Sequence, residues 1–367
     1  MKLSRVLKGL LVACLVLGFA PAAKADAVGD WNAIASQVIS AGGRPGPSTL
    51  VDFAVVHAAV YDAVQAIDRR YKPYHVVIPD ASGSPVAAAA KAARDVLVNR
   101  FPSRTTFIDE TYNVYLATNS LDVNDPGVAV GAAAAAGIIA LRANDGAFPA
   151  VPPAPFTGGG EIGMWRPTPP GFSPMAAPWL ANVTPFAVKS PSQFRAKKAP
   201  ALTSREYAAD YNEVKALGSL FDSSRTQEQT EIGYFWSDNT PIQWHRALRA
   251  VAAANVDNIG DSARLFALAS FSAVDAVITC WETKIHYVYW RPMTAIHEGG
   301  DDGNPATEGD PDWRPLINNP NYPDYTSGAN NVTAAMTRTL ELFFGTDEMT
   351  LTVTSNVAAL PAEKKTR

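Results

Sequence analysis

The sequence predicts an all-α fold in which helices form a bundle around a buried centre. Segment 49–68 is apolar on nearly every side, which is typical of the interior helix of a bundle. Alanine-rich segments at 85–101 and 128–144 have high helix propensity. The sequence shows neither a series of short alternating strands nor a βαβ rhythm. These observations favour the all-α class over any class built on a sheet.

Helical periodicity continues through the second half of the chain. It predicts further helices at 204–217, 226–238, 243–256, 261–290 and 329–344. Gly345 follows the last of these segments and is a typical helix terminator.

Segment 148–200 has a different composition from the helices on either side. It contains 12 of the 28 prolines, which excludes regular structure. A flexible linker is one interpretation, but four aromatic residues favour an ordered loop packed over the bundle: Trp165, Phe172, Trp179 and Phe186. We therefore expect a single domain over 26–367, made of N-terminal helices at 26–147, a Pro-rich loop at 148–201, and helices at 202–367.

The first 25 residues are typical of an export signal. Basic residues precede an apolar run over 10–20, and Ala23 and Ala25 mark a cleavage position. An N-terminal membrane anchor is the alternative, but this run is too short for a helix to cross a bilayer. We expect an exported protein, periplasmic or extracellular, with no stable membrane span after cleavage.

Composition and charge narrow the classes of partner. Hydrophobic residues make up 47% of the chain and charged residues 18%, which excludes intrinsic disorder and a coiled coil. Without the expected signal, 27 basic residues face 35 acidic ones. Because binding to a phosphate backbone needs a surplus of cations, nucleic acid is excluded as a partner. Cleavage would leave only Cys280, so no internal disulfide is expected.

Two cations mark the end of the predicted helix 261–290. Lys284 and Arg291 are two helical turns apart and point in nearly the same direction. Pro292 favours a helix end at Arg291, which would free the guanidinium to turn inward. Two cations on a mostly apolar helix need an anionic partner, either acidic side chains or a bound anion. The same helix carries a polar stripe: Asp275, Thr279, Glu282 and His286.

A second candidate motif precedes the predicted helix 329–344. Its sequence over 323–328 is Pro-Asp-Tyr-Thr-Ser-Gly. Thr326 or Ser327 can cap the helix, and Gly328 allows an oxyanion to approach the free backbone amides. An ordinary helix cap is the alternative interpretation.

Six acidic residues between the two motifs suggest a calcium loop at first sight. They are Glu298, Asp301, Asp302, Glu308, Asp310 and Asp312. Their spacing does not follow the calcium-loop pattern, so we expect a solvated acidic loop.

Together these segments resemble the superfamily of vanadium-dependent haloperoxidases and type 2 phosphatidic acid phosphatases, in particular its exported bacterial haloperoxidase-like branch. Lys284 and Arg291-Pro292 match the KxxxxxxRP motif, and residues 325–328 stand where the family has PSGH. The resemblance extends from about 31 to 354 and includes segments 57–64, 302–307, 313–316 and 343–345.

The resemblance implies an all-α bundle with an oxyanion site at its centre. Lys284 and Arg291 would neutralise the oxygens of vanadate or phosphate. Ser327 would donate its hydroxyl and Gly328 its backbone N–H. A haloperoxidase would use vanadate as cofactor with hydrogen peroxide and halide as substrates, whereas an acid phosphatase would cleave a phosphoester at the same residues.

Two departures from the family pattern lower the expected activity. The family's second motif ends in an acid–base histidine, and this chain has Ala329 at that position. The family's third motif, SRxxxxxH, carries the vanadium-ligating or nucleophilic histidine, and no histidine follows His297 here. We therefore assign no catalytic residue and expect weak or absent turnover, with His297 as the one histidine to consider as a substitute. A non-catalytic phosphate or vanadate binder and a homologue truncated before the third motif remain open.

Overall fold

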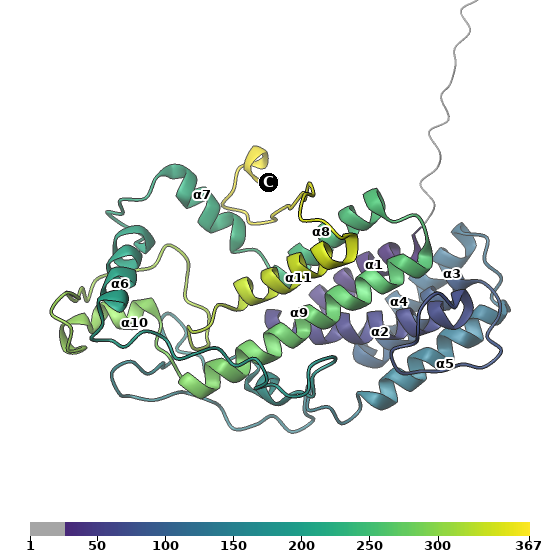
Figure 1. The fold of residues 1–367 in the computed structure, drawn as a ribbon, viewed down its shortest axis with the longest axis horizontal. Coiled ribbons are helices and arrows are strands. Elements are labelled where there is room, and N and C mark those ends of the chain that lie inside the picture. Colours follow the sequence, from purple (N-terminus) through teal and green to yellow (C-terminus); the bar gives the residue numbers. More distant parts are fainter. Residues whose placement is uncertain (1–25) are drawn as a thin grey trace, which may run out of the picture.

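The computed structural model describes residues 26–367, and the expected export signal lies outside this range. Within residues 26–367, regular structure consists of helices, and β-pairing is limited to isolated bridges. The predicted all-α class is confirmed. Figure 1 shows the long helix α9 (Ile259–Tyr287) crossing the molecule with α11 (Gly328–Phe344) beside it.

The N-terminal helices lie toward one end of α9, which α1 and α2 contact, while α3 and α5 pack against α2 (Figure 1). They are α1 (Ala27–Ala41), α2 (Thr49–Asp68), α3 (Pro85–Arg100), α4 (Thr105–Thr118) and α5 (Pro126–Leu141). The later helices are α6 (Arg205–Gly218), α7 (Gln227–Trp236), α8 (Thr240–Asn255) and the short α10 (Pro292–His297). The apolar segment predicted to lie inside the bundle is α2, and its bounds are those predicted.

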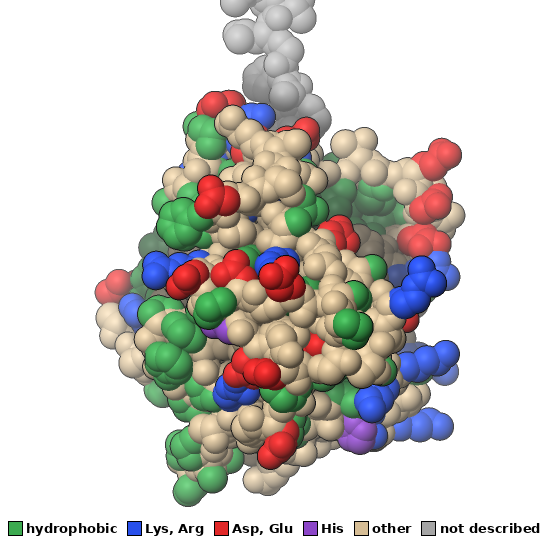
Figure 2. All heavy atoms as spheres, turned by 90° about the vertical axis from the view of Figure 1, so that its left-hand side faces the viewer, with side chains coloured by type: hydrophobic (Ala, Val, Ile, Leu, Met, Phe, Trp, Pro, Cys, Tyr) green, Lys and Arg blue, Asp and Glu red, His purple; other side chains and the backbone are tan. Residues whose placement is uncertain are grey.

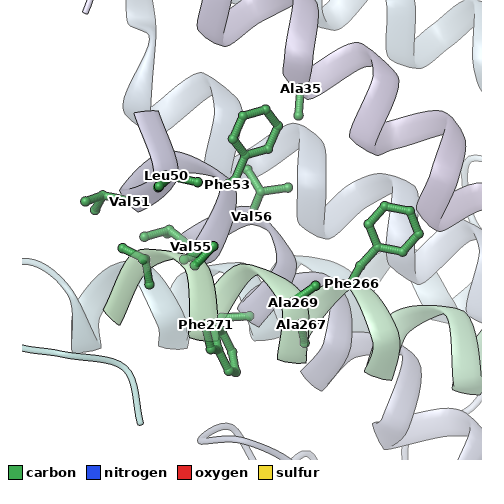
Figure 3. Close-up of a cluster of buried hydrophobic side chains, with 14 of the residues drawn as sticks. Ala35, Leu50, Val51, Phe53, Val55, Val56, Phe266, Ala267, Ala269 and Phe271 are labelled. Atoms are coloured by element: carbon green, nitrogen blue, oxygen red, sulfur yellow. The ribbon is translucent and has the colours of Figure 1, made fainter. Parts of the chain in front are cut away.

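The core forms where α2 meets its neighbours. Helix α2 is buried along most of its length and contacts α3, α5 and α9. Figure 3 shows side chains from α1, α2 and α9 gathered in this core, among them Ala35, Phe53 and Phe266. Both α2 and α9 have the length and apolar composition of membrane-spanning helices, and both are mainly buried inside the bundle.

Helix α9 ends three residues earlier than predicted. Val288 adopts a left-handed conformation, with φ of 48°, and its N–H donates to the Lys284 carbonyl. Residues 288–290 then run beside the Pro-rich segment, because Trp165 N donates to Val288 O at 2.6 Å and Trp290 N to Gly163 O at 3.0 Å. The predicted end at 290 was wrong because this pairing with a distant segment takes the backbone out of the helix.

The polar stripe of α9 attaches the Pro-rich segment to the bundle. Both carboxylate oxygens of Asp275 accept hydrogen bonds from the backbone N–H groups of residues 186–188, at 2.7 to 2.9 Å. Glu282, two turns further on, forms an ion pair with Arg195. Two members of the stripe do not take part in this attachment, since Thr279 lines a cavity and His286 is exposed.

The aromatic residues of the Pro-rich segment differ in burial. Trp165 and Phe186 are buried, and Trp179 packs against the core. Phe172 is 64% exposed, so its predicted role as an anchor was wrong. It occupies a turn with φ of 46°, closed by a hydrogen bond from its N–H to the Thr168 carbonyl, and this turn lies at the surface.

The acidic loop 298–312 is more ordered than a solvated loop. Asp302 is buried and accepts hydrogen bonds from Asn304 N and from the Thr307 hydroxyl, all at 2.8 Å. Asn304 then donates to the carbonyls of Leu202 and Ser204, just before α6. The expectation of a solvated loop was therefore wrong for Asp302, whose carboxylate organises the turn that joins the loop to α6.

Candidate functional site

The C-terminal half of α9 packs against the loop that leads into α11. We call residues 322–327 the motif loop. The Cys280 thiol donates to the Thr326 carbonyl at 3.3 Å, and the ring of Trp281 lies 4.8 Å from that of Tyr322. A Cβ atom on Gly328 would lie only 3.3 Å from the Trp281 ring, so the glycine lets α11 begin directly against the indole. The two motif segments, 40 residues apart, therefore meet in space.

Lys284 is buried on the side of α9 that faces the motif loop. Its Nζ donates to the carbonyls of Pro323 at 2.6 Å and Asp324 at 2.8 Å, and it lies 5.1 Å from the Tyr322 ring centre. Removal of the ammonium from water is costly. Burial therefore lowers the pKa of Lys284 to about 8, and the charge of nearby Arg291 acts in the same direction.

Arg291 reaches the same loop by a different backbone route from the one predicted. It is not on α9 but at the extended N-cap position of α10. Its Nε donates to the Tyr322 carbonyl and its Nη1 to Asp324 Oδ1, both at 2.7 Å. Its remaining nitrogen, Nη2, is buried without a hydrogen-bond partner. The structure thus brings the two cations together on the motif loop.

The predicted serine and glycine lie at the start of α11. The Ser327 hydroxyl accepts a hydrogen bond from Asn330 N at 3.3 Å and so caps its own helix, in an exposed position. Gly328 and Ala329 line a cavity of about 190 Å³ together with the rings of Trp281 and Tyr322. In this arrangement the cations bind the motif loop itself, and the Ser327 hydroxyl serves the helix cap rather than a contact with Lys284 or Arg291.

Asp324 and Tyr322 belong to the site, although sequence reasoning did not single them out. Asp324 is the acidic partner of Arg291, and the Tyr322 ring lies 4.8 Å from the Arg291 guanidinium as well as near Lys284. For Asp324, its acidic side chain inside the second motif was the available signal. Tyr322 had no local signal, because its importance comes from contacts with α9.

His297 is engaged away from the cations. Its Nε2 makes a hydrogen bond with the Trp313 carbonyl at 2.8 Å. Within residues 26–367, the hydrogen bonds of histidine side chains do not involve Lys284, Arg291 or the motif loop. The structure therefore does not place His297 as a substitute for the histidine of either family motif.

Two buried histidines, His57 and His245, form a separate polar cluster in the core. Asn32 Nδ2 donates to His57 Nε2 at 2.7 Å and to His245 Nδ1 at 2.8 Å, while its Oδ1 accepts from Arg249 at 2.6 Å. Burial lowers the pKa of His57 to about 3, so its ring is neutral. This network connects α1, α2 and α8.

Part of the chain is similar in sequence to known proteins. The family described as "VCPO second helical-bundle domain" matches residues 264–366, a range that contains both motif segments. A vanadium chloroperoxidase from Curvularia inaequalis is 27% identical over 190 residues, which cover 43% of this chain and 30% of that protein. Over these residues the chain is similar to vanadium haloperoxidases.

Solved structures show the same fold. A bacterial vanadium-dependent iodoperoxidase superposes with a TM-score of 0.74 and 21% identity, covering 91% of this chain and 85% of that one. A bacterial vanadium-dependent chloroperoxidase gives 0.63 in its apo form, at 17% identity over 83% of this chain and 78% of that one. Its holo form gives 0.62, at 16% identity over 88% and 83%. The haloperoxidase bundle is thus common to chains with little sequence in common.

These relatives are described as vanadium enzymes, and the site residues of this chain fit part of what vanadate would require. Lys284 and Arg291 supply two buried cations, and Arg291 Nη2 is a buried donor that an oxyanion oxygen would satisfy. Asp324 already balances one of the two charges. The described residues therefore fit an anion held by charge and hydrogen bonds, whereas no histidine in residues 26–367 hydrogen-bonds at this site to supply a ligand for vanadium.

The lowered pKa of Lys284 predicts a specific dependence of stability on pH. The folded protein releases this proton near pH 8, whereas the unfolded chain keeps it until about pH 10.4. Between these values the unfolded state binds more protons, so the stability of the wild type should rise with pH relative to a Lys284→Met variant. The expected slope is at most about 1.4 kcal/mol per pH unit. Urea unfolding of both proteins over this range measures it, and parallel pH profiles would contradict the burial of a charged Lys284.

Proposed function

We propose that this chain is a vanadium-haloperoxidase-like protein that binds a small tetrahedral oxyanion, vanadate or phosphate, beside Lys284 and Arg291 at the start of α11. The observation that carries the proposal is the convergence of two buried cations on one short loop. Burial of a cation is costly unless an anion compensates it. Asp324 is the one carboxylate bonded to this pair within residues 26–367, so a bound anion would balance the remaining charge.

The arrangement also supplies hydrogen-bond donors for such an anion. Arg291 Nη2 has no partner, and the first amides of α11 lie directly after the motif loop. Charge-assisted hydrogen bonds contribute about 1.5–3 kcal/mol each, and the positive end of a helix dipole adds to them. The side chain of Asp324 is 39% exposed, so it can give up its bond to Arg291 and turn to solvent when an oxyanion takes its place.

We expect the protein to be exported and its turnover to be weak. A bound vanadate would supply the centre at which haloperoxidases use peroxide to oxidise halide. The residues of this chain would hold and orient the anion, but the methyl group of Ala329 cannot transfer a proton, and a positioned acid–base group contributes about 10²–10⁴-fold. We also propose peroxide and halide, or a phosphoester, as partners of this chain, because these are the substrates of the superfamily that it resembles.

Titration calorimetry with inorganic phosphate, and separately with vanadate, tests the proposal. Lys284→Met and Arg291→Gln should each weaken binding by about 10–100-fold, because each removes a charge-assisted interaction. Arg338→Gln is the matched control, since it removes one positive charge from an exposed position of α11, where Arg338 pairs with Glu341. Circular dichroism confirms that each variant is folded. Unchanged binding in Arg291→Gln, or an equal loss in Arg338→Gln, would refute the site.

A further inference from the structure

A second cavity lies at the end of the molecule that carries α6 and α10, and the haloperoxidase assignment does not account for it. It has a volume of about 220 Å³, is open to the surface, and is lined by parts of α6, of segments 199–200 and 289–296, and of the motif loop. Its polar and aromatic lining consists of Tyr207, Asp210, Tyr211, Tyr289, Trp290, Asp324 and Tyr325. Figure 2 looks onto this end of the molecule, where acidic side chains are spread across the middle of the face.

Aromatic rings line the cavity from two sides. Tyr207 and Tyr211 come from α6, with ring centres 5.9 Å apart and planes at 51°. Tyr289 and Tyr325 come from outside α6, with ring centres 6.2 Å apart and planes at 62°. Trp290 is 1% exposed. Burial raises the pKa of both Tyr211 and Tyr289 to about 12, so these phenols stay neutral and present electron-rich rings.

The charged groups of the cavity are acidic. Neither lysine nor arginine is among the described residues that line it. Asp324 is already bonded to Arg291, whereas Asp210 is exposed and forms no ion pair within residues 26–367. A guest therefore meets several aromatic rings and one uncompensated carboxylate.

We propose that this cavity binds a small organic cation with apolar substituents, such as a quaternary ammonium compound. Aromatic rings attract a cation through their quadrupole, and quaternary ammonium groups are bound in this way because their methyl groups also pack against the rings. Asp210, which is exposed and lines the same cavity, adds a carboxylate. The inference does not rest on the proposed oxyanion site, although the two sites share Asp324 as a neighbour, because cation binding is argued from the aromatic rings and Asp210.

Choline and its neutral isostere 3,3-dimethylbutanol form a matched pair of probes, because they have nearly the same shape and differ in charge. Binding to the full chain is measured by saturation-transfer NMR and calorimetry. We expect choline to bind at least tenfold more tightly than the isostere. Asp210→Asn should weaken choline binding at least fivefold, and Tyr289→Leu at least threefold, while Asp210→Asn leaves phosphate binding unchanged.

Glu213→Gln is the control, since it makes the same change of charge on an exposed position of α6 outside the cavity lining. Equal affinity for choline and its isostere would overturn the proposal, as would no measurable choline binding. An equal loss in Glu213→Gln and Asp210→Asn would also overturn it, because it would show attraction to the general surface charge. Since the choline and isostere measurements use no oxyanion, failure here is distinct from failure of the haloperoxidase-like site.

Discussion

Replacing Asp275 by alanine should cost the protein about 3–5 kcal/mol of its unfolding free energy. Asp275 is 5% exposed, and its carboxylate accepts the backbone N–H groups of residues 186–188. Without it these three donors lose their partner, and a buried unsatisfied donor costs about 1–3 kcal/mol. Because burial raises the pKa of Asp275, part of this loss is offset when the buried charge is removed.

Urea unfolding of a short series measures this effect. Asp275→Asn retains one acceptor oxygen and should lie between the wild type and Asp275→Ala. Asp257→Ala is the control, because Asp257 is exposed and makes no side-chain hydrogen bond in the described chain. A loss below about 1 kcal/mol in Asp275→Ala would mean that the Pro-rich segment is held mainly by its aromatic contacts.

The same variant should also weaken oxyanion binding, although Asp275 is not part of the site. The Pro-rich segment contacts the motif region directly, because Ala176 accepts from Trp281 Nε1 at 3.1 Å and donates to the Asn321 carbonyl at 2.9 Å. Release of the segment at residues 186–188 would loosen these contacts. The motif loop would then no longer be fixed opposite Lys284.

The second large effect is expected for Gly131, where α5 crosses α3. A Cβ atom on Gly131 would lie 2.3 Å from the Ala88 carbonyl oxygen and 3.0 Å from Ala92 N. Both contacts are with helix backbone, which cannot move aside locally. We therefore expect Gly131→Val to cost about 3 kcal/mol or to prevent folding, as overpacking of a dense core does.

Gly131→Ala gives the sharper test, because two physical effects have opposite signs. Helix propensity alone predicts a gain of about 0.5–1 kcal/mol. The close approach of the two helices predicts a loss instead. Ala133→Val is the control for Gly131→Val, because it introduces valine and its helix propensity at an exposed position of α5. Thermal unfolding that shows a more stable Gly131→Ala protein would contradict the tight crossing of α3 and α5.

Local patterns in the sequence predict helices well in this chain. Segment 49–68 coincides with α2, and the predicted segment 329–344 differs from α11 by one residue at its start. Such patterns arise because each helix must present at least one apolar face to the core. The spacing of apolar residues that are close in sequence therefore indicates the helix. The end of α9 at Tyr287 had no such signal, because it depends on pairing with residues 163–165.

Some features of the candidate site can likewise be predicted from the sequence, and others cannot. The amino-acid order shows the two motifs, their distance along the chain, and an alanine at position 329, where the family that the chain resembles has histidine. It also shows that Lys284 and Arg291 need an anionic or hydrogen-bonding partner, because buried cations are costly. These conclusions need only residue types and spacing.

The partners themselves were decided by the tertiary structure. Lys284 binds two carbonyls of the motif loop, Arg291 binds Asp324, and Asp302 turns inward although it belongs to an acidic run. Each of these contacts joins segments whose meeting depends on how whole helices pack. The chemistry of a side chain determines which kind of partner stabilises it, and this can be read from the sequence. The path of distant backbone segments determines which partner it contacts, and this depends on the tertiary structure.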